Sequence, residues 1–271
     1  MSDLVTIDIS EDGIADVRFN RVDKYNALSP EMFQAIISAG EDLAKNKSVR
    51  VVVISGNGRG FCATLDMASM QGMAGDRSSN STSTLMDRDE RPENHAQRPA
   101  YVWKRMPVPV IAAIHGVAYG GGCQIALGAD IRFMAPDAKM SVMEIKWGLI
   151  PDMSITQTLR DLMPLDVAKE LTFTGRILNG QEAKDVGLVT HVTENPLEAA
   201  MALAKEIAGK SPDAIRLGKK LLEESWRAGE REGLEMESVL QRKLIGSPNQ
   251  VEAIKANFEN RAPVFKDAEL G

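Results

Sequence analysis

The fold is decided by VVVISGNGRG at residues 51–60 and by VIAAIHGVAYGGGC at residues 110–123. Each stretch begins with an uninterrupted apolar run, which is typical of a strand buried on both faces of a parallel sheet. Each then passes through glycines, and the second leads into a helical pattern. Because right-handed connections bring the ends of parallel strands to one edge of a sheet, both glycine loops are predicted to face one crevice.

The N-terminal segments predict a hairpin followed by a helix. Residues 5–9 and 14–19 alternate apolar and polar side chains around the turn sequence EDG at 11–13, a pattern that favours a β-hairpin. Ser29 is a suitable N-cap and Pro30 a suitable first residue for a helix, and apolar residues follow at helical spacing.

The C-terminal third predicts helices. Residues 188–192 form a last strand candidate, and the spacing from Asn195 to Glu198 predicts a capping box at the start of a helix. Beyond it the apolar residues repeat at helical spacing. We therefore expect a core over residues 1–195 and a helical subdomain, used for oligomerisation or as a lid, over residues 196–271.

The composition of the 271-residue chain excludes several classes of protein. With 44% hydrophobic and 26% charged residues, it is an ordinary globule rather than a disordered or fibrous chain. The net charge of −6 argues against a nucleic-acid partner. No apolar run approaches the roughly 20 residues of a membrane-spanning helix, so no membrane partner is expected. Two cysteines, Cys62 and Cys123, and no signal peptide favour the cytoplasm.

Residues 75–98 predict a mobile surface loop or lid. They contain the polar run SSNSTST at 78–84 and then mixed charges. Such a segment has almost nothing to bury, so packing is not expected to order it.

The glycines fit neither of two common phosphate-binding motifs. Phe61 stands where the dinucleotide-binding motif after Gly56 requires its last glycine, and the chain contains no P-loop sequence. Loops that lead from a buried strand toward a helix instead offer unpaired backbone N–H groups. Two such groups aimed at one point would form an oxyanion hole, which stabilises a carbonyl oxygen as negative charge develops on it. The alternative is that the glycines only permit tight packing.

Three motifs together resemble the crotonase, or enoyl-CoA hydratase/isomerase, superfamily. They are FCATLDM at 61–67, IAAIHG at 111–116 with GGGC at 120–123, and NR at 20–21 with NAL at 26–28, where Val22 replaces the family's proline. The resemblance covers nearly the whole chain. It implies an α/β fold built as a spiral of ββα turns, a C-terminal helical region that forms a homotrimer or a dimer of trimers, and an acyl-CoA thioester substrate, as in fatty acid metabolism.

The resemblance also assigns the thioester site. By matching position, the backbone N–H groups of Leu65 and Gly121 would form the oxyanion hole. Thr64 departs from the family's glycine, and a β-branched residue would be strained there if the position needed a positive φ. No metal and no separate cofactor are expected, since coenzyme A is part of the substrate. The residues expected to border it are Lys24, Tyr25, Ala27, Ala63, Leu65, Asp66, Met67 and Ala68.

Proton transfer requires acidic groups opposite the hole. Hydratases of the family use two glutamates, but the first matching position here is Gln124, which cannot titrate. The second is Glu144. Asp152 follows where hydratases usually have glycine, and the Glu144/Asp152 pair is similar to that of dienoyl-CoA isomerases, which also have an acid at the position of Gln124. We assign Asp152 as the base at C2 and Glu144 as the acid at the far carbon, and the reverse assignment is the alternative.

Each acid also has a purely structural interpretation. Asp152 could cap a helix that begins near Ser154, and Glu144 could be an exposed strand carboxylate paired with Lys146. The residues around Glu144 are apolar, however, which predicts that its carboxylate is buried. A charge in such a place has a function more often than a charge on a surface.

Four functional hypotheses follow. The first is an isomerase that converts a 3,5-dienoyl-CoA to a 2,4-dienoyl-CoA through Glu144 and Asp152. The second is hydration of a 2-enoyl-CoA, a lyase reaction, by Glu144 with Gln124 holding the water. The third makes Asp152 a nucleophile, as in aryl-CoA dehalogenases that resemble this family. The fourth, from another class, is a catalytically silent CoA-binding scaffold.

Overall fold

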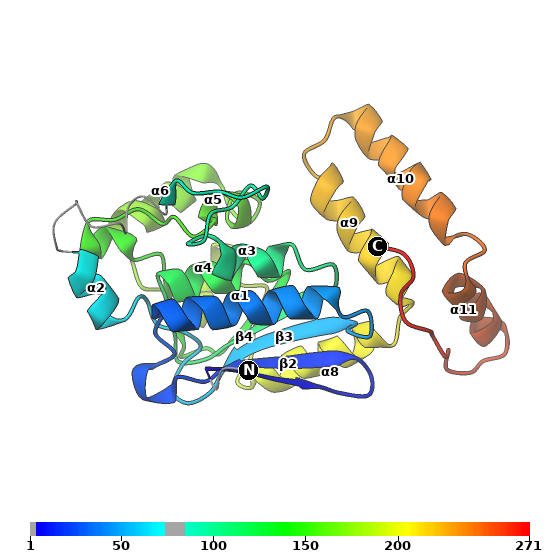
Figure 1. The fold of residues 1–271 in the computed structure, drawn as a ribbon, viewed down its shortest axis with the longest axis horizontal. Helices are drawn as coiled ribbons and strands as arrows, with labels where there is room; N and C mark the ends of the chain where they lie inside the picture. The colour runs from blue at the N-terminus through cyan, green and yellow to red at the C-terminus, as the bar shows by residue number, and fades with distance from the viewer. Residues whose placement is uncertain (1–3, 74–84) are drawn as a thin grey trace.

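The computed structural model describes residues 4–73 and 85–271 and has a mixed α/β fold (Figure 1). A six-stranded sheet has the order β1-β2-β3-β4-β6-β8, and β5 pairs with β7 in a second sheet. The hairpin β1-β2 is antiparallel, and every other pairing is parallel. The strands are β1 (Val5–Ile9), β2 (Ile14–Phe19), β3 (Val51–Gly56), β4 (Val110–Ile114), β5 (Val117–Tyr119), β6 (Ile131–Met134), β7 (Lys139–Ser141) and β8 (His191–Val192).

Helices cover both faces of the large sheet. The α-helices are α1 (Pro30–Lys45), α2 (Met67–Met73), α3 (Arg98–Lys104), α4 (Gly121–Leu127), α5 (Ile155–Thr158), α6 (Leu165–Thr174), α7 (Gly180–Asp185), α8 (Pro196–Ala208), α9 (Pro212–Ser225), α10 (Glu230–Leu244) and α11 (Pro248–Phe258), and the short 3-10 helices are η1 (Val22–Lys24) and η3 (Glu144–Trp147). In Figure 1, α1 lies across one side of the sheet and α8 lies below it. Within the described ranges, no helix is both long enough and apolar enough to cross a membrane.

The two strands predicted from uninterrupted apolar runs are confirmed. β3 and β4 are adjacent and parallel, with Val52 opposite Val110. Alternate side chains of β3 and β4 pack against α1, α3 and α4 on one face, and the others pack against alanines of α8 on the opposite face. Because each buried valine or isoleucine contributes roughly 1.5–3 kcal/mol, this double burial fixes the two strands side by side. Their following loops therefore leave the same edge of the sheet.

The glycine-rich run after β4 also contains a strand that its sequence did not predict. Residues 117–119 form β5, which pairs with β7 beside the large sheet. The predicted helix then begins inside the glycine run, at Gly121, rather than after it. Three-residue strands next to glycines have too short a pattern to be predicted from the sequence.

Two C-terminal predictions are corrected by the structure. Of residues 188–192, only His191 and Val192 form a strand, since the register of β6 with β8 covers two residues. Asn195 precedes α8, but its side chain makes no capping hydrogen bond. A complete capping box is found instead at Asn179, whose side chain accepts from the Glu182 backbone N–H. The predicted helix start at Ser29 is confirmed, since its side chain accepts a hydrogen bond from the Met32 backbone N–H.

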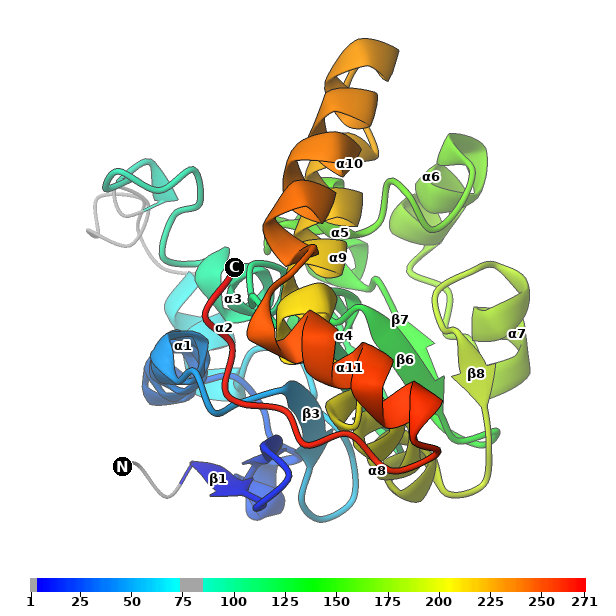
Figure 2. The same cartoon turned by 90° about the vertical axis from the view of Figure 1, so that its right-hand side faces the viewer.

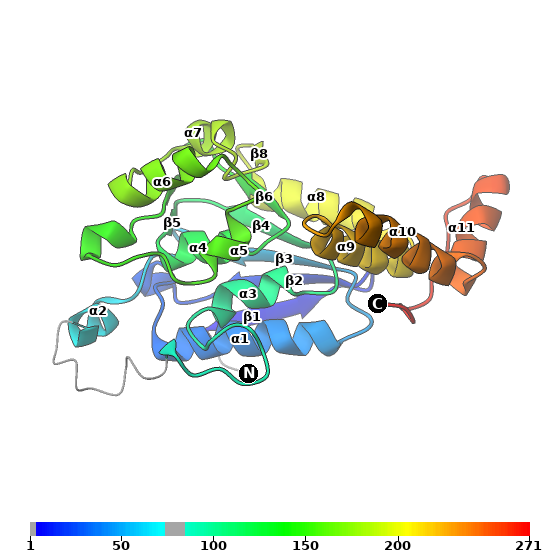
Figure 3. The ribbon, with the colours of Figure 1, turned by 90° about the horizontal axis from the view of Figure 1, so that it is seen from above.

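Helices α9–α11 form an arm that projects past the sheet in Figures 1 and 3, and Figure 2 shows it in front of the sheet. The Lys219 ammonium joins the base of the arm to the core through the Asp130 carboxylate, 2.7 Å away. The predicted boundary between residues 195 and 196 falls before α8, yet α8 packs on the sheet. How the chain divides into folding units stays a prediction.

The lid predicted over residues 75–98 is tested only in part, since residues 74–84 lie outside the described residues. The rest is not free of packing. Glu93 and Asn94 are buried, Arg91 forms an ion pair with Glu41 of α1, and Arg105 contacts Glu93 at 3.3 Å. A hydropathy pattern does not reveal ion pairs and buried polar side chains of this kind, so the sequence predicted a mobile loop.

Candidate active site

The loops after β3 and β4 lie side by side. Cys62 N donates a hydrogen bond to Val117 O at 3.0 Å, and Tyr119 N donates to Cys62 O at 3.1 Å. The start of α4 packs even closer, because a Cβ on Gly122 would lie 2.1 Å from Cys62 O. Only glycine allows this approach at position 122. The two predicted loops are therefore one continuous surface.

Each loop presents an unpaired backbone N–H. Leu28 N donates to Thr64 O at 3.1 Å and Asp66 N donates to Leu28 O at 3.0 Å, so the intervening Leu65 N–H points away from this bridge. Gly121 is the first residue of α4, where helical N–H groups have no partner within the helix. In the described part of the chain, neither N–H donates a hydrogen bond.

Thr64 is not strained at the position where the family has glycine. The positive φ belongs instead to Gly120, at 52°, and Thr64 has a negative φ. The Thr64 side chain packs against Gly120, since a Cβ there would be 2.7 Å from the Thr64 hydroxyl oxygen. The concern that a β-branched residue would distort the Leu65 N–H therefore does not apply.

Asn26 holds the first loop in shape. It is fully buried, with a φ of 56°, and its Nδ2 donates to the carbonyl oxygens of Asn57, Gly60 and Phe61 at 3.0, 2.9 and 3.2 Å. Its Oδ1 accepts from Arg21 N at 2.8 Å. Asparagine tolerates left-handed backbone and can donate twice, which suits this position.

The residues expected to border coenzyme A come from two chain segments that run side by side. Ala63 N donates to Tyr25 O at 2.9 Å. The guanidinium of Arg21 lies 2.9 Å from Ala27 O and 3.0 Å from the Asp66 carboxylate, which joins the two segments. The predicted residues Lys24, Met67 and Ala68 are exposed, and Tyr25, Ala63, Leu65 and Asp66 are partly exposed, whereas Ala27 is buried.

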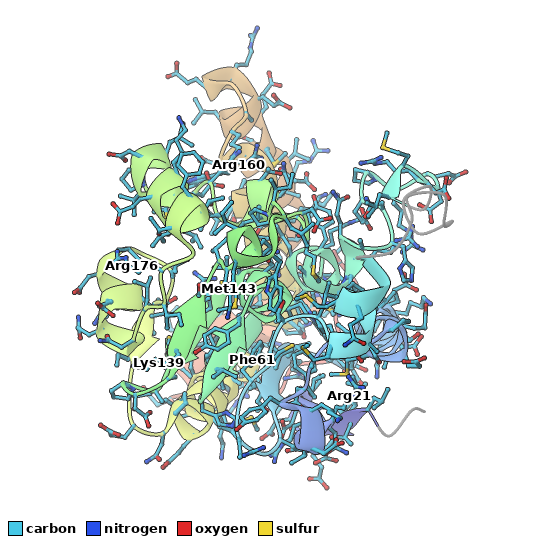
Figure 4. All side chains as sticks on the ribbon, turned by 90° about the vertical axis from the view of Figure 1, so that its left-hand side faces the viewer. Arg21, Phe61, Lys139, Met143, Arg160 and Arg176 are labelled. Atoms are coloured by element: carbon cyan, nitrogen blue, oxygen red, sulfur yellow. The ribbon has the colours of Figure 1, made fainter. Side chains whose placement is uncertain are left out.

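Asp66 and Arg59 both contact neighbouring residues of the two segments expected to border coenzyme A. Asp66 Oδ1 accepts from Ser69 N at 2.9 Å, and this bond, together with Arg21, lowers the pKa of the Asp66 carboxyl. The guanidinium of Arg59 lies 4.1 Å from the centre of the Tyr25 ring. Figure 4 looks onto this side of the molecule, with Arg21, Phe61 and Met143 labelled on neighbouring elements.

Glu144 lies at the start of η3 with its carboxylate buried. The residue is 9% exposed, and its Oε2 is a buried atom without a hydrogen-bond partner. Burial raises the pKa of the Glu144 carboxyl, hydrogen bonds from its own backbone and from Gln124 oppose the shift, and the charge of Asp152 adds to it. The ammonium of Lys146 lies 5.5 Å from the centre of the Trp147 ring, and within the described ranges it forms no ion pair with Glu144, whose Oε2 has no hydrogen-bond partner.

Gln124 is the partner of the other Glu144 oxygen. Its Nε2 donates to Glu144 Oε1 at 2.6 Å, and its Oε1 accepts from Met153 N at 2.8 Å. With 1% exposure, Gln124 is enclosed. It joins α4, η3 and the loop before α5, and it leaves Glu144 Oε2 as the oxygen that can receive or give a proton.

Asp152 is exposed at the surface next to this buried pair. It does not cap α5, whose N-cap is Ser154 with a φ of 66° and no capping hydrogen bond. Desolvation by the surrounding protein atoms raises the pKa of the Asp152 carboxyl. Its charge makes a small further contribution to the raised pKa of Glu144, so the two acids lie near each other, one enclosed and one in contact with solvent.

The remaining candidate groups have ordinary packing roles. Cys62 and Cys123 are free and fully buried, and burial raises the pKa of each thiol. Among residues 4–73 and 85–271, no group of three or more His, Cys, Asp or Glu side chains could hold a metal ion.

Two functional features were not predicted from the sequence. The hydrogen bonds of Asn26 join residues more than 30 positions apart. The NAL motif identified Asn26 itself but not these partners. The bond from the Met153 backbone to Gln124 was also missed, because a buried amide that bridges two loops gives no local pattern.

Residues 10–268 match the family model described as Enoyl-CoA hydratase/isomerase. Mitochondrial methylglutaconyl-CoA hydratase of Mus musculus is 33% identical over 261 residues, covering 94% of this chain and 80% of the relative. Peroxisomal Delta(3,5)-Delta(2,4)-dienoyl-CoA isomerase of Arabidopsis thaliana is 32% identical over 250 residues, covering 91% and 90%. The crystal structure of enoyl-CoA hydratase from Bacillus anthracis matches with a TM-score of 0.87 at 29% identity, covering 97% and 99%.

Proposed function

The chain belongs to the enoyl-CoA hydratase/isomerase family and has the crotonase fold, and we propose that it isomerises a 3,5-dienoyl-CoA to a 2,4-dienoyl-CoA. The family acts on acyl-CoA thioesters. The finer assignment depends on which groups surround the thioester and its carbon chain.

In this proposal the thioester oxygen is held by the N–H groups of Leu65 and Gly121. Both are unpaired and lie on adjoining loops. Removing a proton from C2 places negative charge on that oxygen, and donors fixed in advance stabilise the charge without reorganising. Losing one such donor typically lowers the rate about 10²- to 10³-fold.

The observation that carries the proposal is the buried Glu144 carboxylate with one unpartnered oxygen, with the exposed Asp152 carboxylate near it. Asp152 takes the C2 proton as base, and the electron pair moves through the dienolate. Glu144, whose raised pKa keeps it protonated to higher pH, then gives its proton to C6. After turnover Asp152 carries the proton and Glu144 is ionised, and exchange with solvent restores both acids.

The second candidate is hydration of a 2-enoyl-CoA, which the likeness to methylglutaconyl-CoA hydratase favours. It requires a water held beside Glu144. In this hypothesis Gln124 holds the water, but its Nε2 already donates to Glu144 and its Oε1 already accepts from Met153. An enzyme with one carboxylate and no second group to hold the water should hydrate more slowly than one with two, since each acid-base group typically raises the rate about 10²- to 10⁴-fold.

The test supplies a 3,5-dienoyl-CoA and a 2-enoyl-CoA to the same preparation. We expect isomerisation to be much faster than hydration, and the reverse order would refute the proposal. The Gln124→Glu variant supplies the missing carboxylate and is expected to raise the rate of hydration relative to isomerisation. A covalent acyl- or aryl-enzyme detected by mass spectrometry would favour Asp152 as a nucleophile instead.

We further propose that the chain assembles as a homotrimer or a dimer of trimers. The α9–α11 arm exposes large apolar side chains that the single chain does not cover: Leu222, Trp226, Leu234, Val239, Ile254 and Phe258. Exposed apolar surface on this scale favours an interface, here with further copies of the chain. Light scattering after size exclusion is expected to give three or six chains, and Leu234→Glu is expected to reduce the mass. A monomeric wild type would contradict the assembly.

Finally, we propose a cytoplasmic enzyme without a resident cofactor. Transfer of protons between carboxylates and carbon involves no redox step, and the two free cysteines suit a reducing compartment. Activity that survives exhaustive dialysis against a chelator supports this, and activity restored only by an added metal or nucleotide would contradict it.

A further inference from the structure

The side chain of Thr64 occupies the space between the two loops and Glu144. An ideal Cβ placed on Gly120 would lie 2.7 Å from Thr64 Oγ1, 3.2 Å from Thr64 Cβ and 3.3 Å from Glu144 Oε1. Thr64 and Glu144 therefore close on one small volume next to the Gly120 backbone. A glycine at position 64 would leave most of that volume open.

This volume adjoins the proposed oxyanion hole. Thr64 directly precedes Leu65, and Gly120 directly precedes Gly121, so the contact between them forms the side of the hole that faces Glu144. Thr64 is partly exposed, and its hydroxyl makes no hydrogen bond within the described residues. The residue is therefore not enclosed in the packed core.

We propose that Thr64 is a specificity-determining residue that restricts the enzyme to acyl groups without a branch at C2. This inference rests on the proposed function, because it places the thioester oxygen at Leu65 and Gly121. C2 is bonded to the thioester carbon and must lie between the hole and the acids. A substituent on C2 would then compete with the Thr64 side chain for the same space.

The side chain cannot easily move out of the way. A β-branched residue has few accessible χ1 rotamers, and the Gly120 backbone limits movement of this side chain, because a Cβ on Gly120 would lie 2.7 Å from Thr64 Oγ1. One methyl group too many in such a pocket typically changes kcat/KM about 10- to 200-fold. The effect depends on volume, so valine, which has the same shape without the hydroxyl, is expected to act like threonine.

The experiment compares a linear 3,5-dienoyl-CoA with its 2-methyl derivative in wild type and in Thr64→Gly, Thr64→Ala and Thr64→Val. We expect Thr64→Gly to raise the ratio of kcat/KM for the branched over the linear substrate at least 10-fold. Thr64→Ala should give a smaller rise and Thr64→Val none. An unchanged ratio in Thr64→Gly, or an equal rise in Thr64→Val, would overturn the proposal.

A binding measurement separates this inference from the proposed reaction. Calorimetry with octanoyl-CoA and 2-methyloctanoyl-CoA needs no turnover, and the relative affinity for the branched ligand is expected to rise in Thr64→Gly. Thr193→Gly, next to the edge strand β8, is the matched control and should not change it. If wild type fails to isomerise the linear dienoyl-CoA but the affinities shift, the reaction is wrong and the steric role stands. If isomerisation occurs and the affinities do not shift, the steric role is wrong.

Discussion

Replacing Gln124 by leucine tests how the buried acid is held. The change removes the bond to Glu144 Oε1 at 2.6 Å and the bond from Met153 N at 2.8 Å. Leucine has nearly the same volume, so packing around the 1% exposed side chain is kept. The variant therefore isolates the two hydrogen bonds.

The expected loss of stability follows from the groups left without partners. A buried polar group whose partner is removed costs about 1–3 kcal/mol, and two are stranded here. Burial of the leucine side chain returns about 1–2 kcal/mol. We therefore expect the free energy of unfolding to fall by about 2.5 kcal/mol at the middle of these ranges, which span about 0–5 kcal/mol, measured by urea denaturation at neutral pH.

The variant also changes the pH dependence of isomerisation. The bond from Gln124 lowers the pKa of Glu144, so its loss raises that pKa further above the usual range. In the proposed mechanism Glu144 is the acid, so the decline of kcat at high pH should move to higher pH. Gln34→Leu, on the exposed surface of α1, is the control. A decline that stays in place or moves to lower pH would refute the assignment of Gln124 as a positioning residue.

Three further predictions concern the acid and the loops. Glu144→Gln should lower the rate of isomerisation about 10²- to 10⁴-fold. Because the pKa of Glu144 is raised in the folded state, its ionisation destabilises wild type as the pH rises, so the variant should have the higher melting temperature at pH 8 and the difference should narrow toward pH 4. A difference in melting temperature that does not depend on pH would contradict the burial of Glu144. Asn26→Ala should lower the free energy of unfolding, measured in urea, by roughly 2–4 kcal/mol. Asn260 also has a positive φ but is exposed, so Asn260→Ala should lower it much less. Equal losses in the two variants would contradict the role of Asn26 in holding the loop. Gly122→Ala should weaken acyl-CoA binding, measured by calorimetry, by about 10-fold or more, because its Cβ would lie 2.1 Å from the main-chain oxygen of Cys62. The control Gly218→Ala meets nothing within 4 Å and should stabilise α9 by about 0.5–1 kcal/mol. Unchanged binding in Gly122→Ala would show that the two loops can separate.

The core of the fold could be predicted because its signal is local. Uninterrupted apolar runs at β3 and β4 mark strands buried on both faces, and Ser29 before Pro30 marks a helix start. β5 could not be predicted, and β8 is shorter than the strand predicted over residues 188–192, because strands of two or three residues are too short to show a period. Pairing with neighbouring strands, which depends on the whole sheet, is what makes them strands.

The site could be predicted only as far as its residue types. Burial of Glu144 followed from its apolar neighbours, and the two glycine loops predicted that backbone N–H groups would meet. The role of Gln124 depends on contacts with residues 20 and 29 positions away, and the ion pair from Arg91 to Glu41 spans 50 positions. Contacts at this separation are set by topology and not by spacing along the chain.

Deuterium exchange at C2 of a 3,5-dienoyl-CoA tests most directly whether backbone N–H groups hold a thioester enolate while two acids move its protons. In D₂O, wild type should place deuterium at C6 of the product. Glu144→Gln should exchange the C2 proton of unreacted substrate without forming product, and Asp152→Asn should do neither. The mechanism would be contradicted if Asp152→Asn exchanged the C2 proton at the wild-type rate. It would also be contradicted if neither wild type nor Glu144→Gln exchanged the C2 proton.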